Sequence, residues 1–334
     1  MIAVVSIAAV RSTVDLKEIR YKINSTQQAA AKLQPATIHY QLPTINYQLP
    51  TTNYQLPHEV KIHMVRDTLR SYDAASGSDK ALAIAVVLAG GRGSRMKSDT
   101  PKQYLPLEGI PVLAYSLKRF EECDAVDGIV LVTGNGEIDW CKENIVKFYG
   151  FHKVLCVTAG GKERWQSVHA GLCTIKNLID HRTIGGCSYV LIHDGARPLL
   201  DEPLLQRNLA CAREKGCAVT GMPVKDTIKI CREDGSVVTT PDRSVTWLVQ
   251  TPQTFLFHEI LEAYDCLAKE AEEAIIKGNA KTEKSPVTDD AMVMERFGKR
   301  QVYMCEGSYR NIKITTPEDL EIAGQYLSSA SSGR

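Results

Sequence analysis

The sequence has almost no net charge and no apolar run of membrane-spanning length. Its 334 residues include 40 lysines and arginines against 39 aspartates and glutamates, which leaves a formal net charge of +1. Because no summed field would attract a phosphate backbone, this balance excludes the usual electrostatic case for a nucleic-acid partner. No apolar run approaches the roughly 18 to 20 residues that span a bilayer, so we do not expect a membrane protein. Any recognition of anions must therefore depend on a few local cations.

Paired cysteine motifs and a secretory signal are also missing. The ten cysteines include no CxxC pair and stand singly inside apolar stretches. A disulfide scaffold is typical of short secreted chains, and a zinc site needs ligands at short spacing. The apolar start of the chain has no basic residue before it, and Arg11 is its first charge, which disfavours a signal peptide. We therefore expect reduced thiols packed in the core of a cytoplasmic protein.

The first 80 residues contain a repeat and no pattern of a folded domain. The segment Tyr-Gln-Leu-Pro begins at Tyr40, Tyr47 and Tyr54. A spacing of seven is typical of coiled coils, but a proline in every repeat removes a backbone donor and clashes with the preceding turn. We therefore predict a poorly ordered extension over residues 1–80. Such an extension would result if a start codon upstream of Met64 were used. The functional alternative is a peptide docking motif, and a plastid transit peptide is a weaker alternative because the early residues are not rich in Ser or Arg.

Residues 81–330 alternate short apolar runs with amphipathic segments, which predicts one α/β domain. Continuous apolar strands separated by helices indicate a doubly wound, mostly parallel sheet that is covered on both faces. In such sheets ligands bind beyond the carboxyl ends of the strands. The predicted strands are 82–88, 128–133, 153–158 and 189–193, and the predicted helices are 112–122, 137–148 and 164–177. The loops that follow these strands are therefore the places to look for a site.

One segment breaks this alternation and predicts a β-hairpin. Residues 227–231 and 236–240 alternate polar and apolar side chains, and Asp234-Gly235 between them is a strong hairpin turn. A hairpin inserted into an α/β sheet cannot bury both of its faces on its own domain. We therefore expect a protruding arm, over about residues 224–250, that binds a partner subunit. The alternative is a flap over its own site.

A glycine-rich loop follows the first predicted strand. Residues 88–96 (LAGGRGSRM) match neither a Walker A loop nor the GxGxxG spacing of a dinucleotide fold. Its glycines let the backbone approach a phosphate chain, although a tight turn alone would also explain them. Arg95 in this loop and Lys102 shortly after it can neutralise charge on a departing pyrophosphate. The pattern favours phosphoryl or nucleotidyl transfer.

Asp194 directly follows a buried apolar strand, residues 189–193. A carboxylate there is suited to holding Mg²⁺ between nucleotide phosphates. The alternatives are a helix N-cap or a salt bridge to Arg197. The preceding His193 is expected to be packed and hydrogen-bonded rather than a base, because the chain has no Ser or Cys nucleophile signature.

Eight segments in order resemble the 2-C-methyl-D-erythritol 4-phosphate cytidylyltransferase family. The resemblance runs from about residue 81 to residue 327 and omits the N-terminal extension. The segments are LAGGRGSRM at 88, PKQYLPL at 101, GGKERWQSV at 160, HDGARP at 193, PVKDTIK at 223, QTPQTF at 250, VTDDA at 287 and NIKITTPEDL at 311. Ribitol 5-phosphate cytidylyltransferases resemble this family closely and remain the alternative, with a non-catalytic nucleotide-binding protein as a remote one.

The resemblance implies a Rossmann-like nucleotidyltransferase fold and transfer of CMP from CTP to a polyol phosphate, 2-C-methyl-D-erythritol 4-phosphate, in isoprenoid biosynthesis. It also implies Mg²⁺ as cofactor and a homodimer whose hairpin arm reaches the partner's site. The residues that match the family's functional positions are Arg95 and Lys102 for catalysis; Ala89, Gly90, Gly91, Gly161, Arg164 and Ser167 for CTP; Asp194, Arg197, Thr227, Arg243, Thr251 and Lys313 for the acceptor; and Asp194 again for the metal.

Overall fold

The computed structural model describes residues 63–64, 82–91, 96, 98, 100–276 and 287–331. The chain divides into two units, Met1–Thr52 and Asn53–Arg334, and every described residue belongs to the second. The YQLP repeats and Arg95 therefore lie outside the described residues. The predicted character of the N-terminal extension stays a prediction.

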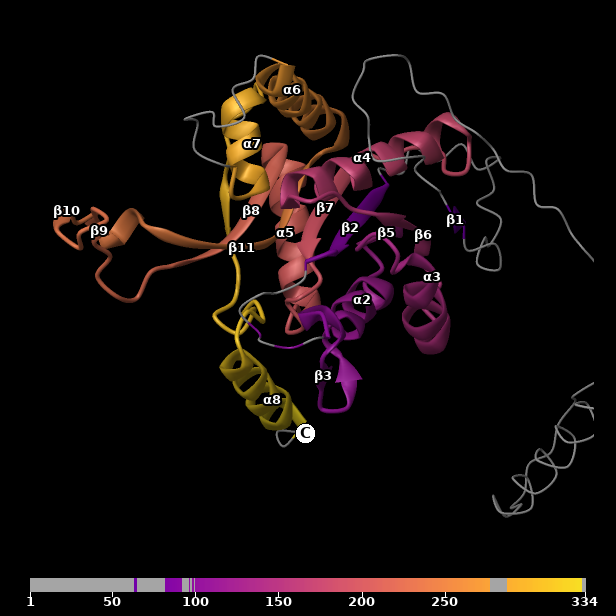
Figure 1. Cartoon of the computed structure of the whole chain (residues 1–334), viewed down its shortest axis with the longest axis horizontal. Helices are drawn as coiled ribbons and strands as arrows, with labels where there is room; N and C mark the ends of the chain where they lie inside the picture. The colour runs from indigo at the N-terminus through magenta and orange to yellow at the C-terminus, as the bar shows by residue number, and fades with distance from the viewer. Residues whose placement is uncertain are drawn as a thin grey trace, which may run out of the picture. The chain divides into compact units, whose positions relative to one another are not determined.

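An eight-stranded sheet forms the centre of the second unit (Figure 1). Its strands, in spatial order, are β1 (His63–Met64), β6 (Val154–Ala159), β5 (Gly128–Thr133), β2 (Ala83–Ala89), β7 (Tyr189–Asp194), β11 (Trp247–Leu256), β8 (Cys217–Pro223) and β12 (Met304–Glu306). Strands β6, β5, β2 and β7 are parallel, and β12 is parallel to β8. Only β1 and β11 run antiparallel to their neighbours. The predicted mostly parallel α/β sheet is confirmed.

Helices cover both faces of this sheet. They are α2 (Val112–Glu122), α3 (Ile138–Cys141) with its π-helical continuation η4 (Lys142–Lys147), α4 (Arg164–Asp180), α5 (Glu202–Lys215), α6 (Phe257–Ile276) and α7 (Asp290–Phe297). A further helix, α8 (Pro317–Ser331), packs in a smaller separate cluster with Leu107 and Val112. The short elements between them are η3 (Lys102–Tyr104), β3 (Pro106–Leu107), β4 (Ile110–Pro111) and η5 (Arg243–Val245). Figure 1 shows α4 and α6 on one side of the sheet and α2 and α3 on the other.

The alternation of side chains along β2 builds two separate cores. Ala85 and Val87 point to the core that includes α2 and α5, and Ile84 and Val86 point to the core that includes α4, α6 and α7. All four are at most 1% exposed. Burying a valine or isoleucine side chain contributes about 1.5–3 kcal/mol. The central strands are therefore packed on both faces, and their carboxyl ends form a rigid edge of the sheet at which a site can be built.

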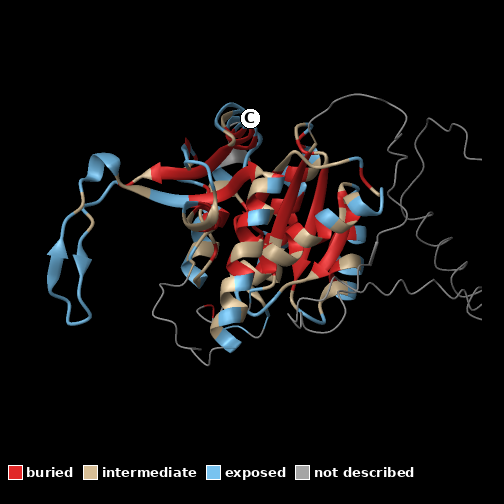
Figure 2. Ribbon diagram, turned by 90° about the horizontal axis from the view of Figure 1, so that it is seen from above, coloured by how far each residue is buried: buried red, intermediate tan, exposed pale blue. Residues whose placement is uncertain are grey.

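The predicted hairpin is present but shorter than expected. Strands β9 (Ile230–Cys231) and β10 (Val237–Thr239) pair antiparallel, and residues 227–229 are not in a strand. Gly235 in the turn has a φ of +82°, which glycine adopts without strain. Figure 2 shows the hairpin in the exposed colour, away from the buried strands of the main sheet. Ile230, Val237 and Val238 are 50–54% exposed, so these apolar side chains have little cover from their own chain.

Three further expectations can be compared with the structure. The charged stretch 269–287 predicts a helix end followed by a loop; residues 269–276 are the end of α6, and residues 277–286 lie outside the described residues. The cysteines are not all in the core: five are buried, four are half-buried and Cys231 on the hairpin is exposed. All ten lie among the described residues, and none forms a disulfide. Within the described part of the chain, no helix is long and apolar enough to cross a membrane.

Candidate active site

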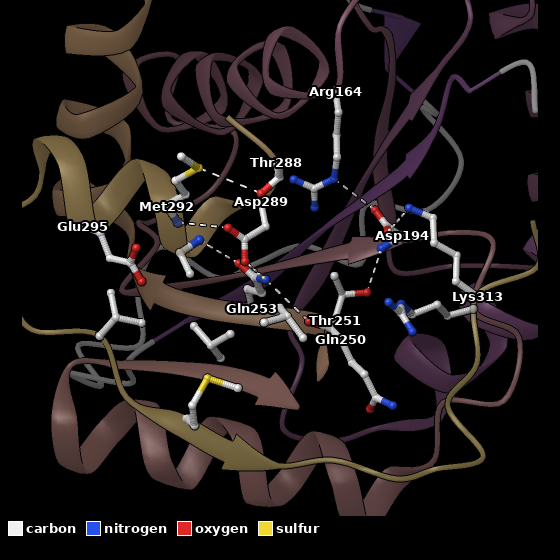
Figure 3. A pocket seen from close by; sticks show the side chains of 16 residues that line it. Arg164, Asp194, Gln250, Thr251, Gln253, Thr288, Asp289, Met292, Glu295 and Lys313 are labelled. Carbon is white, nitrogen blue, oxygen red and sulfur yellow. Dashed lines mark hydrogen bonds and ion pairs between the residues drawn. The ribbon is translucent and has the colours of Figure 1, made fainter. Parts of the chain in front are cut away.

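Asp194 lies at the carboxyl end of β7 between two cations (Figure 3). Its Oδ1 accepts from Nε of Arg164 at 3.2 Å, and its Oδ2 accepts from Nζ of Lys313 at 2.7 Å. Its backbone N–H donates to Oγ1 of Thr251 at 3.1 Å. Burial alone would raise the pKa of Asp194, but Arg164, Lys313 and Arg197 lower it well below its usual range. The site therefore contains a carboxylate that stays ionised.

The turn after Asp194 is fixed by close packing. A Cβ on Gly195 would lie 2.7 Å from Cδ1 of Leu113 and 2.9 Å from the carbonyl oxygen of Leu88, so this position requires glycine. Oγ of Ser116 donates to the carbonyls of Gly195 and Arg197, at 3.2 and 3.0 Å. Asp194 is not the N-cap of α5, since Asp201 caps that helix. Its direct ion pairs are with Arg164 and Lys313.

Arg164 is the first residue of α4, where a capping box of Glu163 and Gln166 starts the helix. Its Nη1 and Nη2 donate to the two carboxylate oxygens of Asp290, at 2.9 and 2.8 Å. Asp290 is 0% exposed and also accepts from the hydroxyl of Tyr264 at 2.5 Å. Burial would lower the pKa of Arg164, but Asp290 and Asp194 raise it well above its usual value. One fixed guanidinium therefore joins two carboxylates.

These residues line a cavity of about 540 Å³. Five predicted site residues line it: Arg164, Asp194, Arg197, Thr251 and Lys313. The other lining residues are Val219, Val249, Gln250, Gln253, Thr288, Asp289, Ala291, Met292, Glu295, Val302 and Met304. Figure 3 shows Lys313 and Arg164 reaching Asp194 from opposite sides. The predicted acceptor residues of the core thus share one cavity.

Arg197 and the loop before Lys313 form a second buried polar group. Nη1 of Arg197 donates to the carbonyl of Asn311 at 2.7 Å, and Nδ2 of Asn311 donates to the carbonyl of Thr251 at 2.8 Å. Nε of Arg197 and Oδ1 of Asn311 are buried and have no hydrogen-bond partner among the described residues. Burial lowers the pKa of Arg197, against the opposing effect of Asp194. A buried donor beside the cavity suits an anionic ligand.

Among the described residues of the glycine loop, Ala89, Gly90 and Gly91 do not line this cavity, and neither does Lys102. The carbonyl of Ala89 accepts from Nε2 of Gln103 at 2.5 Å, which joins the end of β2 to η3. A Cβ on Gly90 would lie 3.3 Å from the Thr133 carbonyl, whereas Gly91 is open. Lys102 begins η3 and is half-buried.

The remaining predicted residues divide into two groups. Gly161 and Ser167 flank the start of α4, and Oγ of Ser167 donates to the Glu163 carbonyl at 3.3 Å. Thr227 and Arg243 are exposed and do not line the cavity of their own chain. Nη1 of Arg243 donates to the carbonyl of Lys225 at 3.2 Å. A single chain therefore does not bring all the predicted acceptor residues together.

His193 is packed and hydrogen-bonded, as expected. It is 0% exposed, its Nδ1 is 3.1 Å from Oγ1 of Thr251, and its ring meets Phe120 edge-on. Burial lowers its pKa to about 3, although Asp194 opposes that shift. The imidazole is neutral at physiological pH and stays inside the core.

The site includes residues to which the sequence analysis assigned no role. Oε1 of Gln253 accepts from the backbone N–H of Ala291 at 2.8 Å, and its Nε2 donates to Asp289 at 3.0 Å. Together with Asp290 these residues fasten α7 to the sheet. The available signal was the pair of consecutive carboxylates in VTDDA, which the resemblance had singled out.

Comparison with known proteins identifies close similarity to one enzyme family. A family model described as 2-C-methyl-D-erythritol 4-phosphate cytidylyltransferase matches residues 83–329. A relative of that name from Alkaliphilus oremlandii is 42% identical over 249 residues, which cover 75% of this chain and 96% of the relative. Another, from Lachnoclostridium phytofermentans, is 44% identical over 243 residues, which cover 73% and 95%.

Solved structures that resemble this chain come from the same enzyme family. The 4-diphosphocytidyl-2C-methyl-D-erythritol synthase of Anaerococcus prevotii superimposes with a TM-score of 0.59 at 27% identity, covering 74% of this chain and 99% of that one. The 2-C-methyl-D-erythritol 4-phosphate cytidylyltransferase of Francisella tularensis gives 0.56 at 28% identity, covering 73% and 99%.

Proposed function

The chain belongs to the 2-C-methyl-D-erythritol 4-phosphate cytidylyltransferase family, and on this premise we propose how its residues take part in the reaction. It is a nucleotidyltransferase that transfers CMP from CTP to 2-C-methyl-D-erythritol 4-phosphate in isoprenoid biosynthesis. A phosphate oxygen of the acceptor attacks the α-phosphorus of CTP, and the bond from that phosphorus to the bridging oxygen of pyrophosphate breaks. The attacking group is already an anion at neutral pH, so alignment and charge neutralisation supply most of the catalysis.

The observation that carries this proposal is the position of Asp194 between Arg164 and Lys313 on the wall of the cavity. An incoming acceptor phosphate competes with Asp194 for Lys313 and offers a partner to the buried Nε of Arg197. The released carboxylate of Asp194 is then available to the acceptor's hydroxyl groups or to a metal ion. Thr251 adds a hydroxyl group to the same wall.

The CTP side of the site is assigned to the loops beyond β2 and β6. We assign the backbone at Ala89, Gly90 and Gly91 to the nucleotide, because Ala89 ends the strand beside β7 and the two glycines follow it directly. Gly161 and Ser167 are assigned to the cytosine and ribose, and Arg164 to the nucleotide phosphates. At least three of the five N–H donors of Arg164 already bind Asp194 and Asp290, so it would act mainly through its charge.

Lys102 and Arg95 are assigned to the phosphoryl transfer itself. In this role they stabilise the charge that develops on the pentacoordinate α-phosphate and on the departing pyrophosphate. A positioned cation or donor of this kind typically contributes about 10²- to 10³-fold in rate. Lys102 is half-buried in η3, which is fastened to Ala89 through Gln103.

The donor set around Asp194 fits Mg²⁺. Mg²⁺ usually binds one or two carboxylates together with substrate phosphates. Asp194 is an ionised carboxylate on the cavity wall, and its present partners, Arg164 and Lys313, are cations that an arriving triphosphate can attract away. When bound, Mg²⁺ would supply charge neutralisation for the nucleotide phosphates. We therefore propose Asp194 as its protein ligand.

We propose that the site is completed by the arm of a second copy in a homodimer. Thr227 and Arg243 belong to residues 224–250 and do not line the cavity of their own chain. The same segment exposes apolar side chains: Val245 is 74% and Leu248 is 52% exposed, in addition to those of the hairpin. Apolar surface concentrated on a thin projection favours burial against a partner.

Steady-state assays with CTP, Mg²⁺ and either acceptor test the assignment. We expect a much higher kcat/KM with 2-C-methyl-D-erythritol 4-phosphate than with ribitol 5-phosphate. A preference for ribitol 5-phosphate would contradict the acceptor assignment, and CTP binding without turnover of either acceptor would indicate a non-catalytic nucleotide-binding protein. We also propose cytoplasmic residence, which ten cysteines without a disulfide favour.

A further inference from the structure

Helices α4 and α6 bring a histidine, a cysteine and an aspartate together away from the cavity. His169 and Cys173 are one turn apart on α4, and Asp265 lies on α6. Nε2 of His169 is 2.8 Å from Oδ1 of Asp265. One imidazole nitrogen, the thiol sulfur and one carboxylate oxygen all lie within 4.8 Å of one another. None of the three residues lines the cavity described above.

These three ligand types match a borderline-soft metal ion. Zn²⁺ binds imidazole nitrogen, thiolate sulfur and carboxylate oxygen, at about 2.0–2.3 Å from each. In a tetrahedral site such bonds place neighbouring ligand atoms about 3.3–3.8 Å apart. The cluster is close to that arrangement, so small side-chain rotations suffice. Mg²⁺ prefers oxygen ligands alone and would not compete for a thiol and an imidazole.

We propose that His169, Cys173 and Asp265 form a binding site for a zinc-class divalent ion, with water in the fourth position, that ties α4 to α6. Residues four apart on a helix lie on one face, which makes His169 and Cys173 a natural pair of chelating ligands. The third ligand comes from another helix, so the binding site can form only after folding. The site is separate from the magnesium position at Asp194 and does not depend on it.

The surroundings of His169 fix its ring while leaving an entry path. The His169 side chain is 16% exposed and stacks on Tyr264, with ring centroids 6.3 Å apart and planes at 14°. The Asp265 side chain is 49% exposed, so an ion and its water can reach the cluster from solvent. A ring already held in place loses little conformational freedom when it binds a metal.

Burial would lower the pKa of His169, but its hydrogen bonds to Asp265 and Cys173 raise it to about 9. Imidazole and thiol groups bind metal ions in their deprotonated forms, so the affinity of the cluster for the ion should rise with pH.

The cluster also touches the support of the active site. Tyr264, which stacks on His169, donates a hydrogen bond from its hydroxyl group to Asp290, and Asp290 also accepts from Arg164. An ion between α4 and α6 would restrain the two helices that carry Arg164 and Tyr264. Asp265 is 96 residues from His169 in the sequence, so the spacing of the cysteines does not indicate this site.

Spectroscopic titration of the full chain with Co²⁺, after removal of metal by a chelator, tests the proposal. Co²⁺ reports zinc-type sites through ligand-field bands in the visible region and a thiolate-to-metal charge-transfer band in the near ultraviolet. We expect one equivalent to bind with both features, and Zn²⁺ to displace it. Cys173→Ser should abolish the charge-transfer band, and His169→Gln should weaken binding by at least about tenfold.

Cys266→Ser is the matched control, because Cys266 is half-buried on α6 beside Asp265 but is not part of the cluster. It should titrate like the wild type. Absence of the band from the wild type, its persistence in Cys173→Ser, or its equal loss in Cys266→Ser would overturn the proposal. Asp265→Asn provides a variant at the exposed ligand should Cys173→Ser fail to fold.

A thermal unfolding series gives an independent readout. A ligand that binds only the folded state raises the unfolding temperature. Zn²⁺ should therefore raise the Tm of the wild type and of Cys266→Ser and leave the Tm of Asp265→Asn nearly unchanged. An equal rise in all three would mean that Zn²⁺ binds elsewhere and would overturn the assignment.

Discussion

The guanidinium of Arg164 and the carboxylate of Asp290 form a two-pronged ion pair, at 2.9 and 2.8 Å, between residues 126 positions apart in the sequence. The third contact of Arg164 is with Asp194, at 3.2 Å. One side chain thus joins the start of α4, the carboxyl end of β7 and the first residue of α7. The position of the cavity wall depends on this junction.

We expect Asp290→Asn to destabilise the protein by about 3 kcal/mol, the lower end of the range for breaking a buried ion pair, because Arg164 keeps Asp194 and is partly exposed. Urea unfolding measures the change. Asp289→Asn is the control: asparagine also caps helices, so only the oxygen that accepts from Gln253 is lost and the destabilisation should be clearly smaller. Equal losses in both variants would show that the Arg164 pair has no special contribution.

Lys102→Ala should lower kcat by about 10²- to 10³-fold and change CTP affinity little, because the lysine is assigned to charge that develops in the transition state. Steady-state kinetics together with CTP binding by calorimetry separate the two effects. Lys118→Ala, an exposed lysine on α2, should behave like the wild type. A Lys102 variant with unchanged turnover would contradict the assignment.

A mixture of two inactive variants tests the composite site. In the proposed homodimer Lys102 acts in its own chain's site and Arg243 acts in the partner's site. Coexpressed Lys102→Ala and Arg243→Ala chains should therefore form mixed dimers in which one site has both residues, and activity should return. Each variant alone stays weakly active. If coexpression restores nothing although mixed dimers are isolated, Arg243 acts within its own chain or not at all.

The acid stability of the protein should depend on Asp194. Its folded-state pKa lies well below the value of 3.8 for an unperturbed side chain, so the unfolded chain binds the proton more readily. The carboxylate therefore contributes stability above about pH 3.8, and that contribution is lost as the pH falls further. Asp194→Asn should show a shallower loss of unfolding free energy below this pH. Identical slopes, measured with refolding at pH 7 as the reversibility check, would contradict the ion-pair geometry.

A chain that starts at Met64 should keep full activity and the oligomeric state of the full chain. Met64 pairs with Cys156 at the edge of the sheet, and the family match begins only at residue 83. Kinetics and light scattering on both chains provide the comparison. Loss of activity on truncation would instead support a functional role for the YQLP repeats.

Local patterns were sufficient for much of the fold. The helix predicted over 112–122 and the strand over 128–133 coincide with α2 and β5, because apolar periodicity is a local property. Strand β11 was not predicted: its sequence mixes apolar and polar residues and includes Pro252, although it lies between β7 and β8. Its position depends on pairing with two strands that are distant in the sequence, and a local sequence pattern carries no information about such pairing.

For the site, the sequence by itself determined which residue types stand at the carboxyl ends of the strands and, through the ordered motifs, the enzyme family. Only the tertiary structure decided that Asp290 holds Arg164, that Arg197 keeps a buried donor beside the cavity, and that Thr227 and Arg243 lie outside it. The physical reason is that ion pairs and burial depend on which distant segments meet. The near-zero net charge shows the same limit: it argues against a broad anionic partner, whereas the cations that line the cavity, Arg164, Arg197 and Lys313, are brought together only by folding.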